Sequence, residues 1–101
     1  MKKVIKNYIE KIENSKVYEV ASISPLTKAD NLSKELANSI FLKREDLQPT
    51  HSFKIRGAYN KIAHLYQSKK IADVATASAG NHAQGVAYSA QELGVKATIF
   101  M

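Results

Sequence analysis

The chain has 101 residues and a formal net charge of +6, with 45% hydrophobic and 24% charged residues. This size and composition are typical of one small globular domain, and the absence of cysteine excludes a disulfide framework or a cysteine-based metal site. No apolar run approaches the roughly 20 residues of a membrane span, and the N-terminus lacks the apolar segment of a signal peptide. We therefore expect a cytoplasmic protein with no membrane partner.

Residues 1–16 combine lysines with an apolar stripe at helical spacing, formed by Val4, Ile5, Tyr8, Ile9 and Ile12. A positive net charge can indicate a nucleic-acid partner. However, the sequence contains no helix-turn-helix or zinc-finger spacing and no basic groove interleaved with aromatic residues. We interpret the lysines as the solvated face of a helix and expect no nucleic-acid partner.

The middle of the chain predicts short elements separated by turns. The stretch "VYEVASISPL" should be extended, because residues ahead of Pro25 are pushed out of helical dihedral angles. A short helix is predicted over Thr27–Ala37 and a short apolar strand over Ile40–Lys43. After the turn "LQPT", Ser52 is a suitable N-cap for a helix that continues to about Tyr66.

The last third of the chain predicts strand, helix and strand. "ADVATA" is a strand that ends at Ser78, a helix follows over Asn81–Leu93, and Gly94 stands where a helix C-terminal glycine belongs. A second strand begins at Lys96 and continues to Met101. Together with the strand at 40–43, this order predicts an α/β fold, a parallel sheet with right-handed crossover helices. Because no helix follows the last strand, we expect the domain to be incomplete.

Lys54 lies at the start of a predicted helix, where the helix dipole disfavours a cation by about 0.3–1 kcal/mol. A lysine at such a position can be a nucleophile that forms a Schiff base with a carbonyl compound. Arg56 could act as a second cation that assists, but it is expected to be exposed. Alternatively, Lys54 is an ordinary lysine at a helix start, paired with Glu45 or Asp46. These two carboxylates, beside Arg44, are interpreted as a solvated or salt-bridged turn.

The segment "TASAGNHAQG" joins a predicted strand to a helix through small residues, a geometry that can bind an anion with free backbone N–H groups. Gly80 and Gly85 have the spacing of the Walker A glycines, but Val86 and Ala87 replace its lysine and serine or threonine, and GxGxxG is absent. The loop therefore suits a small phosphate or carboxylate. The alternative is a tight turn that is merely capped by Ser78 or Asn81.

The histidines give no evidence of a metal centre. His51 and His64 have no partner at the spacing of metal ligands. His82, in the first turn of a predicted helix, could be a base or a ligand, although a structural role is the simpler interpretation. We predict no metal ion.

The stretches "KREDLQPTHSFKIRGAY" and "TASAGNHAQGVA" together closely resemble the fold-type II pyridoxal-phosphate enzymes, and the threonine dehydratases (threonine deaminases) above all. The resemblance extends over nearly all of residues 17–101. It implies a tryptophan synthase beta-like, three-layer α/β fold, truncated here, with residues 1–101 as the N-terminal part of the catalytic domain. The family's glycine-rich phosphate loop and the side chain facing the pyridine nitrogen would lie downstream. "THS" resembles the biosynthetic form, which serves isoleucine synthesis.

The resemblance also implies the roles of individual residues. Lys54 would carry pyridoxal 5'-phosphate as a Schiff base, Asn81 would hydrogen-bond the ring oxygen of the cofactor, and Phe53 would pack near it. The substrate carboxylate would be bound by Ser78, Ala79, Gly80, Asn81 and His82.

The implied reaction is β-elimination from L-threonine to 2-oxobutanoate and ammonia, with L-serine as a possible second substrate, in a homo-oligomer. Ala79 stands where serine racemases carry a second serine, which disfavours racemisation. The alternatives are a serine/threonine dehydratase or serine racemase of the same fold, or a non-catalytic module that binds a small anion.

Overall fold

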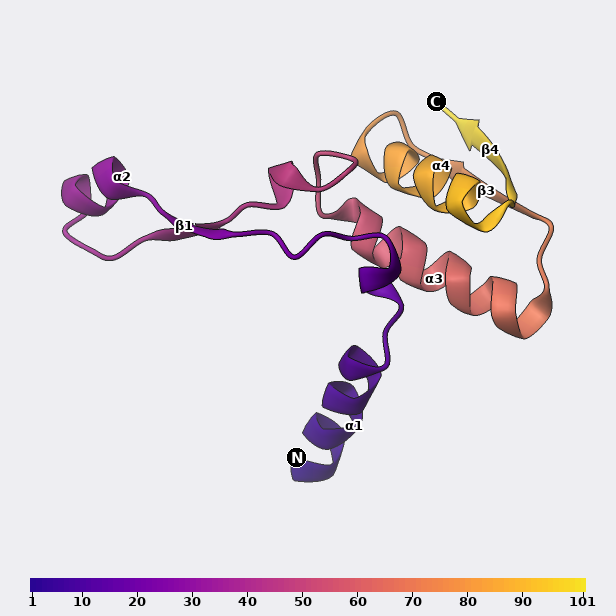
Figure 1. Ribbon diagram of the computed structural model, residues 1–101, viewed down its shortest axis with the longest axis horizontal. Helices are drawn as coiled ribbons and strands as arrows, with labels where there is room; N and C mark the ends of the chain where they lie inside the picture. The colour runs from indigo at the N-terminus through magenta and orange to yellow at the C-terminus, as the bar shows by residue number, and fades with distance from the viewer.

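The computed structural model describes all residues, 1–101. The elements are α1 (Lys2–Glu13), the 3-10 turn η1 (Val17–Glu19), β1 (Leu26–Lys28), α2 (Asp30–Glu35), β2 (Phe41–Lys43), the 3-10 turn η2 (Glu45–Leu47), α3 (Lys54–Lys69), β3 (Asp73–Ala77), α4 (Asn81–Leu93) and β4 (Lys96–Phe100). The radius of gyration is 16.8 Å, against about 13 Å for a compact chain of this length. Figure 1 shows the reason: residues 54–101 form a packed body, and from residues 1–53, here called the arm, α1 and the segment of β1 and α2 project in two different directions.

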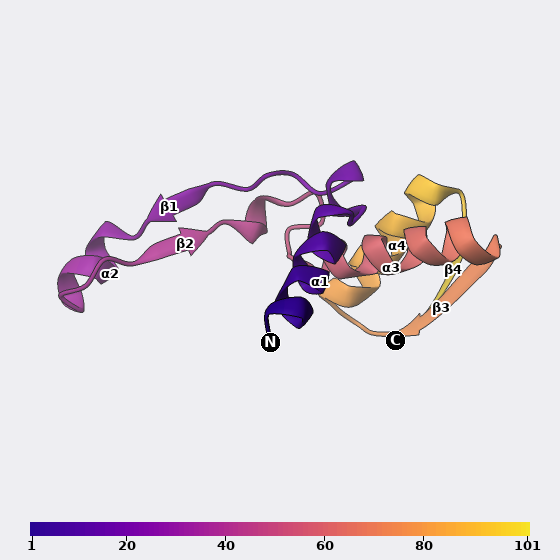
Figure 2. The ribbon, with the colours of Figure 1, turned by 90° about the horizontal axis from the view of Figure 1, so that it is seen from below.

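The body is a β-α-β unit with an additional helix. β3 and β4 are parallel, with a register that runs from Asp73 opposite Lys96 to Ala77 opposite Phe100. Alternate residues of both strands are half-buried, and the others are exposed. Figure 2 shows α3 and α4 together on one side of the two strands. The predicted parallel sheet and crossover are confirmed, but helices cover only one face of the sheet within these residues.

The helices of the body follow the predicted pattern closely. Ile55, Tyr59 and Ile62 are buried on one face of α3, as their spacing predicts. α4 has the predicted bounds, and Gly94 ends it in the left-handed region with φ +66°. α3 continues past the predicted end at Tyr66 and ends at Lys69, so the polar residues after Tyr66 are also helical.

The arm differs from the prediction. The helix predicted over Thr27–Ala37 is divided into β1 and the shorter α2, and the strand near Ile40 pairs antiparallel with β1 instead of joining the parallel sheet. The physical cause is a local hairpin. The Ala29 N–H donates to the Ile40 carbonyl at 2.9 Å, and the Ile40 N–H donates to Ser33 Oγ at 3.0 Å. Part of the stretch expected to be extended also forms η1.

α1 forms where it was predicted, but none of its residues is buried. The apolar stripe of residues 4, 5, 8, 9 and 12 lies on a helix that projects from the rest of the chain (Figure 1). No helix of the structure has the length and apolar character needed to cross a membrane.

The arm is attached to α3 by polar contacts. Buried Tyr59 donates its hydroxyl to Glu19 Oε2 at 2.6 Å, and the Lys16 N–H donates to Asn60 Oδ1 at 3.0 Å. Burial, followed by the bond to Glu19, raises the pKa of Tyr59 to about 12. The first half of α3 is therefore attached to the arm.

Candidate functional site

The first turn of α3 has neither a side-chain N-cap nor an acidic residue, the two features that usually stabilise a helix start. Ser52 is not the N-cap that the sequence predicts, because Phe53 takes that position and makes no side-chain capping bond. Ser52 Oγ accepts the Lys54 N–H at 3.4 Å, from one residue further out. The turn contains no acidic residue, although it carries both Lys54 and Arg56. Two cations at a helix N-terminus are unfavourable unless an anion approaches from elsewhere in the chain.

The two acidic residues that precede α3, Glu45 and Asp46, do not pair with Lys54. Glu45 forms an ion pair with Arg56, and Asp46 pairs with Arg44 at 2.7 Å. Lys54 takes part in none of the ion pairs of the structure. The alternative that Lys54 is a paired surface lysine is therefore wrong. Its Nζ lies 5.2 Å from the centroid of the Phe53 ring.

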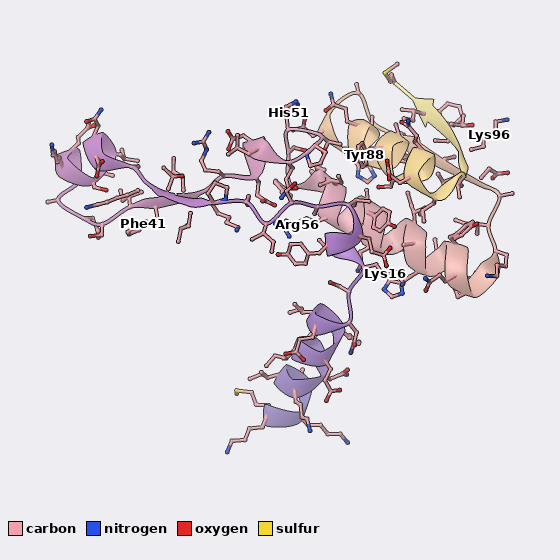
Figure 3. The ribbon with its side chains drawn as sticks, viewed as in Figure 1. Lys16, Phe41, His51, Arg56, Tyr88 and Lys96 are labelled. Carbon is pink, nitrogen blue, oxygen red and sulfur yellow. The ribbon has the colours of Figure 1, made fainter.

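Arg56 is the centre of a polar cluster where the arm meets α3 (Figure 3). Its Nε donates to Glu45 Oε1 and its Nη2 donates to Glu45 Oε2 at 3.1 Å. Ser24 Oγ and Gln48 Nε2 also donate to Glu45 Oε2. The guanidinium lies over the Tyr18 ring, 5.2 Å from its centroid. The hydrogen bond from Arg56 is the main cause that lowers the pKa of Glu45 to about 2, so this carboxylate is ionised at physiological pH.

Gln48 connects the same cluster to Ser22, in an earlier segment of the arm. The side chain is only 1% exposed. Its Nε2 donates to the Ser22 carbonyl at 2.7 Å, and its Oε1 accepts the Ser22 N–H at 2.8 Å. The sequence does not predict this contact, because a single glutamine in a turn has no periodicity that marks it as buried.

The loop before α4 combines both interpretations that the sequence left open. Ser78 Oγ accepts the N–H groups of Gly80 and Ala83, each at 3.3 Å, so Ser78 does cap the helix start. Asn81 does not act as the cap. The N–H groups of Ala79, Asn81 and His82 have no hydrogen-bond partner within the chain. These groups, at the positive end of α4, are available to a carboxylate.

Gly85 places the two helix starts in contact. A Cβ atom at this position would lie 3.2 Å from both the C and O atoms of Lys54 and 3.3 Å from the Cβ of Ala58. A side chain at this position would require the neighbouring part of α3 to shift by a few tenths of an ångström. The absence of a side chain at Gly85 therefore brings the segment that bears Asn81 and His82 next to the backbone of Lys54.

A pocket of about 220 Å³ opens at this contact and is lined by Phe53, Lys54, Arg56, Gly57, Ala58 and His82. It brings three of the predicted site residues together: Phe53, Lys54 and His82. The others, at positions 78 to 81, lie in the adjoining loop and do not line the pocket. A wider hollow of about 500 Å³ at the tip of the arm, between Lys28 and Ser39, contains neither motif.

The chain matches a known protein family over most of its length, including both segments of the candidate site. Residues 18–101 match the family described as pyridoxal-phosphate dependent enzymes. The chain belongs to this family. The resemblance seen in the sequence and the fold-type II class are therefore confirmed, and the family's cofactor is pyridoxal phosphate.

Curated relatives of the chain include biosynthetic threonine dehydratases. The chain is 54% identical over 94 residues to the biosynthetic L-threonine dehydratase of Pasteurella multocida, covering 93% of the chain and 18% of that protein. It is 56% identical over 94 residues to the chloroplastic biosynthetic threonine dehydratase 1 of Solanum lycopersicum, covering 93% of the chain and 16% of that protein. The chain thus spans less than a fifth of the length of these relatives.

Solved structures give the same family and a wider range of activities. The processed threonine deaminase isoform 2 of Solanum lycopersicum superimposes with a TM-score of 0.87 at 46% identity, covering 96% of this chain and 27% of that one. The serine racemase of Dictyostelium discoideum gives a TM-score of 0.75 at 31% identity, covering 96% and 30%. The fold alone therefore does not distinguish a threonine deaminase from a serine racemase.

Proposed function

We propose that the chain is the N-terminal part of the catalytic domain of a pyridoxal-phosphate dependent threonine dehydratase, which converts L-threonine to 2-oxobutanoate and ammonia. The observation that carries the proposal is Lys54, an amine without an acidic partner, on a pocket where the two family motifs meet. The 54–56% identity to biosynthetic threonine dehydratases supports the choice of substrate and the connection to isoleucine synthesis.

The residues present fit the cofactor. A pyridoxal group needs a primary amine that is not held in an ion pair, and Lys54 supplies one. The pocket beside this amine has the aromatic ring of Phe53 on one wall and the small residues Gly57 and Ala58 on another. When bound, pyridoxal phosphate withdraws electrons from the substrate Cα and so makes the Cα proton removable.

In this proposal the chain's own groups bind the substrate and move its proton. The Lys54 amine holds the cofactor and, once released, takes the proton from the substrate Cα. The free N–H groups of Ala79, Asn81 and His82 bind the substrate carboxylate, and the side chain of Asn81 donates to the cofactor's ring oxygen. The oxygen of Ser78 already accepts two N–H groups, so its own proton is available to the carboxylate. Gly80, without a side chain, leaves this backbone accessible.

The deciding experiment uses a full-length threonine dehydratase whose first residues are replaced by this chain, called the host enzyme below. Lys54→Ala should abolish 2-oxobutanoate release and also the cofactor adduct that borohydride fixes at residue 54. Lys69→Ala, which removes an exposed lysine at the other end of α3, is the matched control and should keep both. Turnover at the unsubstituted rate in Lys54→Ala would refute the assignment and favour a non-catalytic anion-binding module.

Racemisation is the second candidate, because a serine racemase shares the fold with a TM-score of 0.75. We expect the host enzyme to act on L-threonine, more slowly on L-serine, and to form little D-serine, since Ala79 offers no acid-base group. Efficient D-serine formation would establish the racemase instead. A homo-oligomer and a cytoplasmic location remain predictions, and the native mass of the host enzyme tests the first.

A further inference from the structure

Three residues other than glycine have a left-handed backbone conformation: Ala37 at φ +48°, His51 at φ +55° and Lys70 at φ +50°. This conformation is unfavourable for a residue with a Cβ atom. Ala37 and Lys70 follow the ends of α2 and α3, where a left-handed residue commonly ends a helix. His51 has a different location, since it lies ahead of a helix and three residues before Lys54. Strained backbone of this kind is often found at functional sites.

The surroundings of His51 hold it in this conformation. Its N–H donates to the Gln48 carbonyl at 2.8 Å, which closes a turn over residues 48–51. The Gln48 side chain is itself fixed by its two bonds to Ser22. The exposed ring of His51 places Nδ1 3.3 Å from the backbone oxygen of Asp46. The turn is therefore anchored to the arm on the side that precedes His51.

The left-handed residue also sets the direction in which the chain enters α3. Its two neighbours, Thr50 and Ser52, are both buried, at 8% and 7% exposure. Ser52 Oγ accepts the Lys54 N–H at 3.4 Å, and the centroid of the next ring, Phe53, lies 5.2 Å from Lys54 Nζ. Because φ at residue 51 fixes the path of the chain on one side relative to the other, a change in its sign would move Ser52 away from Lys54.

We propose that His51 is a positioning residue whose left-handed backbone, rather than its imidazole, places Ser52 and Phe53 against Lys54. The inference rests on the proposed function, since it concerns the amine assigned to the cofactor. Glycine adopts a positive φ without a steric cost, asparagine tolerates it, and β-branched residues disfavour it most. The activity should therefore follow the ease with which residue 51 adopts a positive φ.

The test compares four substitutions of His51 in the host enzyme. His51→Gly and His51→Asn should keep kcat for L-threonine within about twofold. His51→Val should lower kcat by about tenfold or more, because a misplaced reacting group is costly in rate. KM should change by less than about twofold, since the N–H groups proposed to bind the carboxylate lie on another segment. His51→Ala should fall between glycine and valine, and this pair of small residues, both without an imidazole, isolates the backbone effect.

A second measurement needs no cofactor. In the cofactor-free host enzyme, amide hydrogen exchange at Lys54 reports the bond from its N–H to Ser52 Oγ. Exchange should be faster in His51→Ala and His51→Val than in the unsubstituted protein, and unchanged in His51→Gly. This result does not depend on turnover, so it remains informative if the assignment of Lys54 to the cofactor fails.

Lys70→Val is the matched control, because Lys70 has nearly the same φ at the other end of α3. It should lower the thermal midpoint about as much as His51→Val, since both place a β-branched residue in the left-handed region. It should nevertheless leave kcat and the exchange at Lys54 unchanged.

Three results would overturn the proposal. Loss of kcat in His51→Gly equal to that in His51→Ala would assign the role to the imidazole. Equal kcat in all variants, or equal exchange at Lys54 in His51→Gly and His51→Val, would show that φ at residue 51 does not position Lys54. A fall of kcat in Lys70→Val as large as that in His51→Val would attribute the effect to stability alone.

Discussion

The body and the arm are held together by different interactions. Every buried hydrophobic residue belongs to the body, with the exception of Ala21. The buried side chains of the arm are otherwise polar, namely Ser24, Ser33, Gln48, Thr50 and Ser52. The body is thus stabilised by non-directional apolar contact, which tolerates small shifts, and the arm by hydrogen bonds, which require particular atoms in particular places.

The largest expected effect is the loss of an apolar side chain from the body. Ile55 is fully buried at 0% exposure, directly after Lys54. Ile55→Ala should destabilise the host enzyme by about 2–5 kcal/mol in urea denaturation, because it leaves a cavity that the helices fill only in part. Ile9→Ala, on the exposed stripe of α1, should change stability by less than about 0.5 kcal/mol. An equal cost at Ile9 would show that another part of the host enzyme covers α1, and the contrast between the regions would fail.

A smaller effect is expected where the body is packed most tightly. Gly85→Ala places a Cβ atom 3.2 Å from the Lys54 backbone, and we expect a cost of about 1–3 kcal/mol, since the backbone of α3 would have to shift by a few tenths of an ångström and backbone yields less readily than a flexible side chain. Gly57→Ala is the matched control, with nothing within 4 Å of the added atom, and it should be neutral or stabilising because alanine favours a helix. Denaturation of the two variants side by side measures the difference. Equal stability would mean that α3 and α4 can separate at no cost.

In the arm, the comparable test removes one buried amide. Gln48→Ala leaves the N–H and C=O groups of Ser22 without their partner, and we expect a cost of about 1–3 kcal/mol. Hydrogen exchange at the Ser22 amide should accelerate at the same time. Gln84→Ala, at an exposed position of α4, is the control and should change neither. A Gln48→Ala variant of unchanged stability would indicate that apolar contacts also hold the arm.

The same contrast explains which parts of the structure could be predicted from the sequence. The spacing of Ile55, Tyr59 and Ile62 predicts α3, and the glycine in the left-handed region predicts the end of α4, because both are local properties of the chain. The hairpin of β1 and β2 depends on Ser33 bonding the backbone of Ile40, and Glu45 pairs with Arg56, 11 residues further along the chain, across the turn that precedes α3. Such partners follow from the tertiary fold, and no local pattern distinguishes Arg56 from Lys54 as the partner of Glu45.

A pH-dependent test concerns Glu45, whose pKa is lowered from 4.5 to about 2 in the folded chain, mainly by its bond from Arg56. Because the folded pKa lies below the unfolded one, the ionised group stabilises the fold at pH values above about 4.5, and this contribution is lost as the pH falls towards 2. Glu45→Gln should therefore flatten the decline in stability over this range. An unchanged slope in acid denaturation of the variant would show that other carboxylates cause the decline.

The smallest expected effect is a gain in stability within the arm. Thr50 is buried, and its Oγ1 is the one buried side-chain oxygen or nitrogen without a hydrogen-bond partner. Valine has nearly the same shape and lacks the hydroxyl, so Thr50→Val removes an unsatisfied polar group without opening a cavity, and we expect a stabilisation of about 1 kcal/mol.

Ser52→Ala is the matched control for this gain, two residues further along the chain. The Ser52 hydroxyl accepts the Lys54 N–H, so its removal should destabilise the start of α3. The thermal midpoints of the two variants should therefore move in opposite directions. If Thr50→Val lowers the midpoint as Ser52→Ala does, the Thr50 hydroxyl is bonded in the host enzyme, and the polar attachment of the arm extends to a group outside these residues.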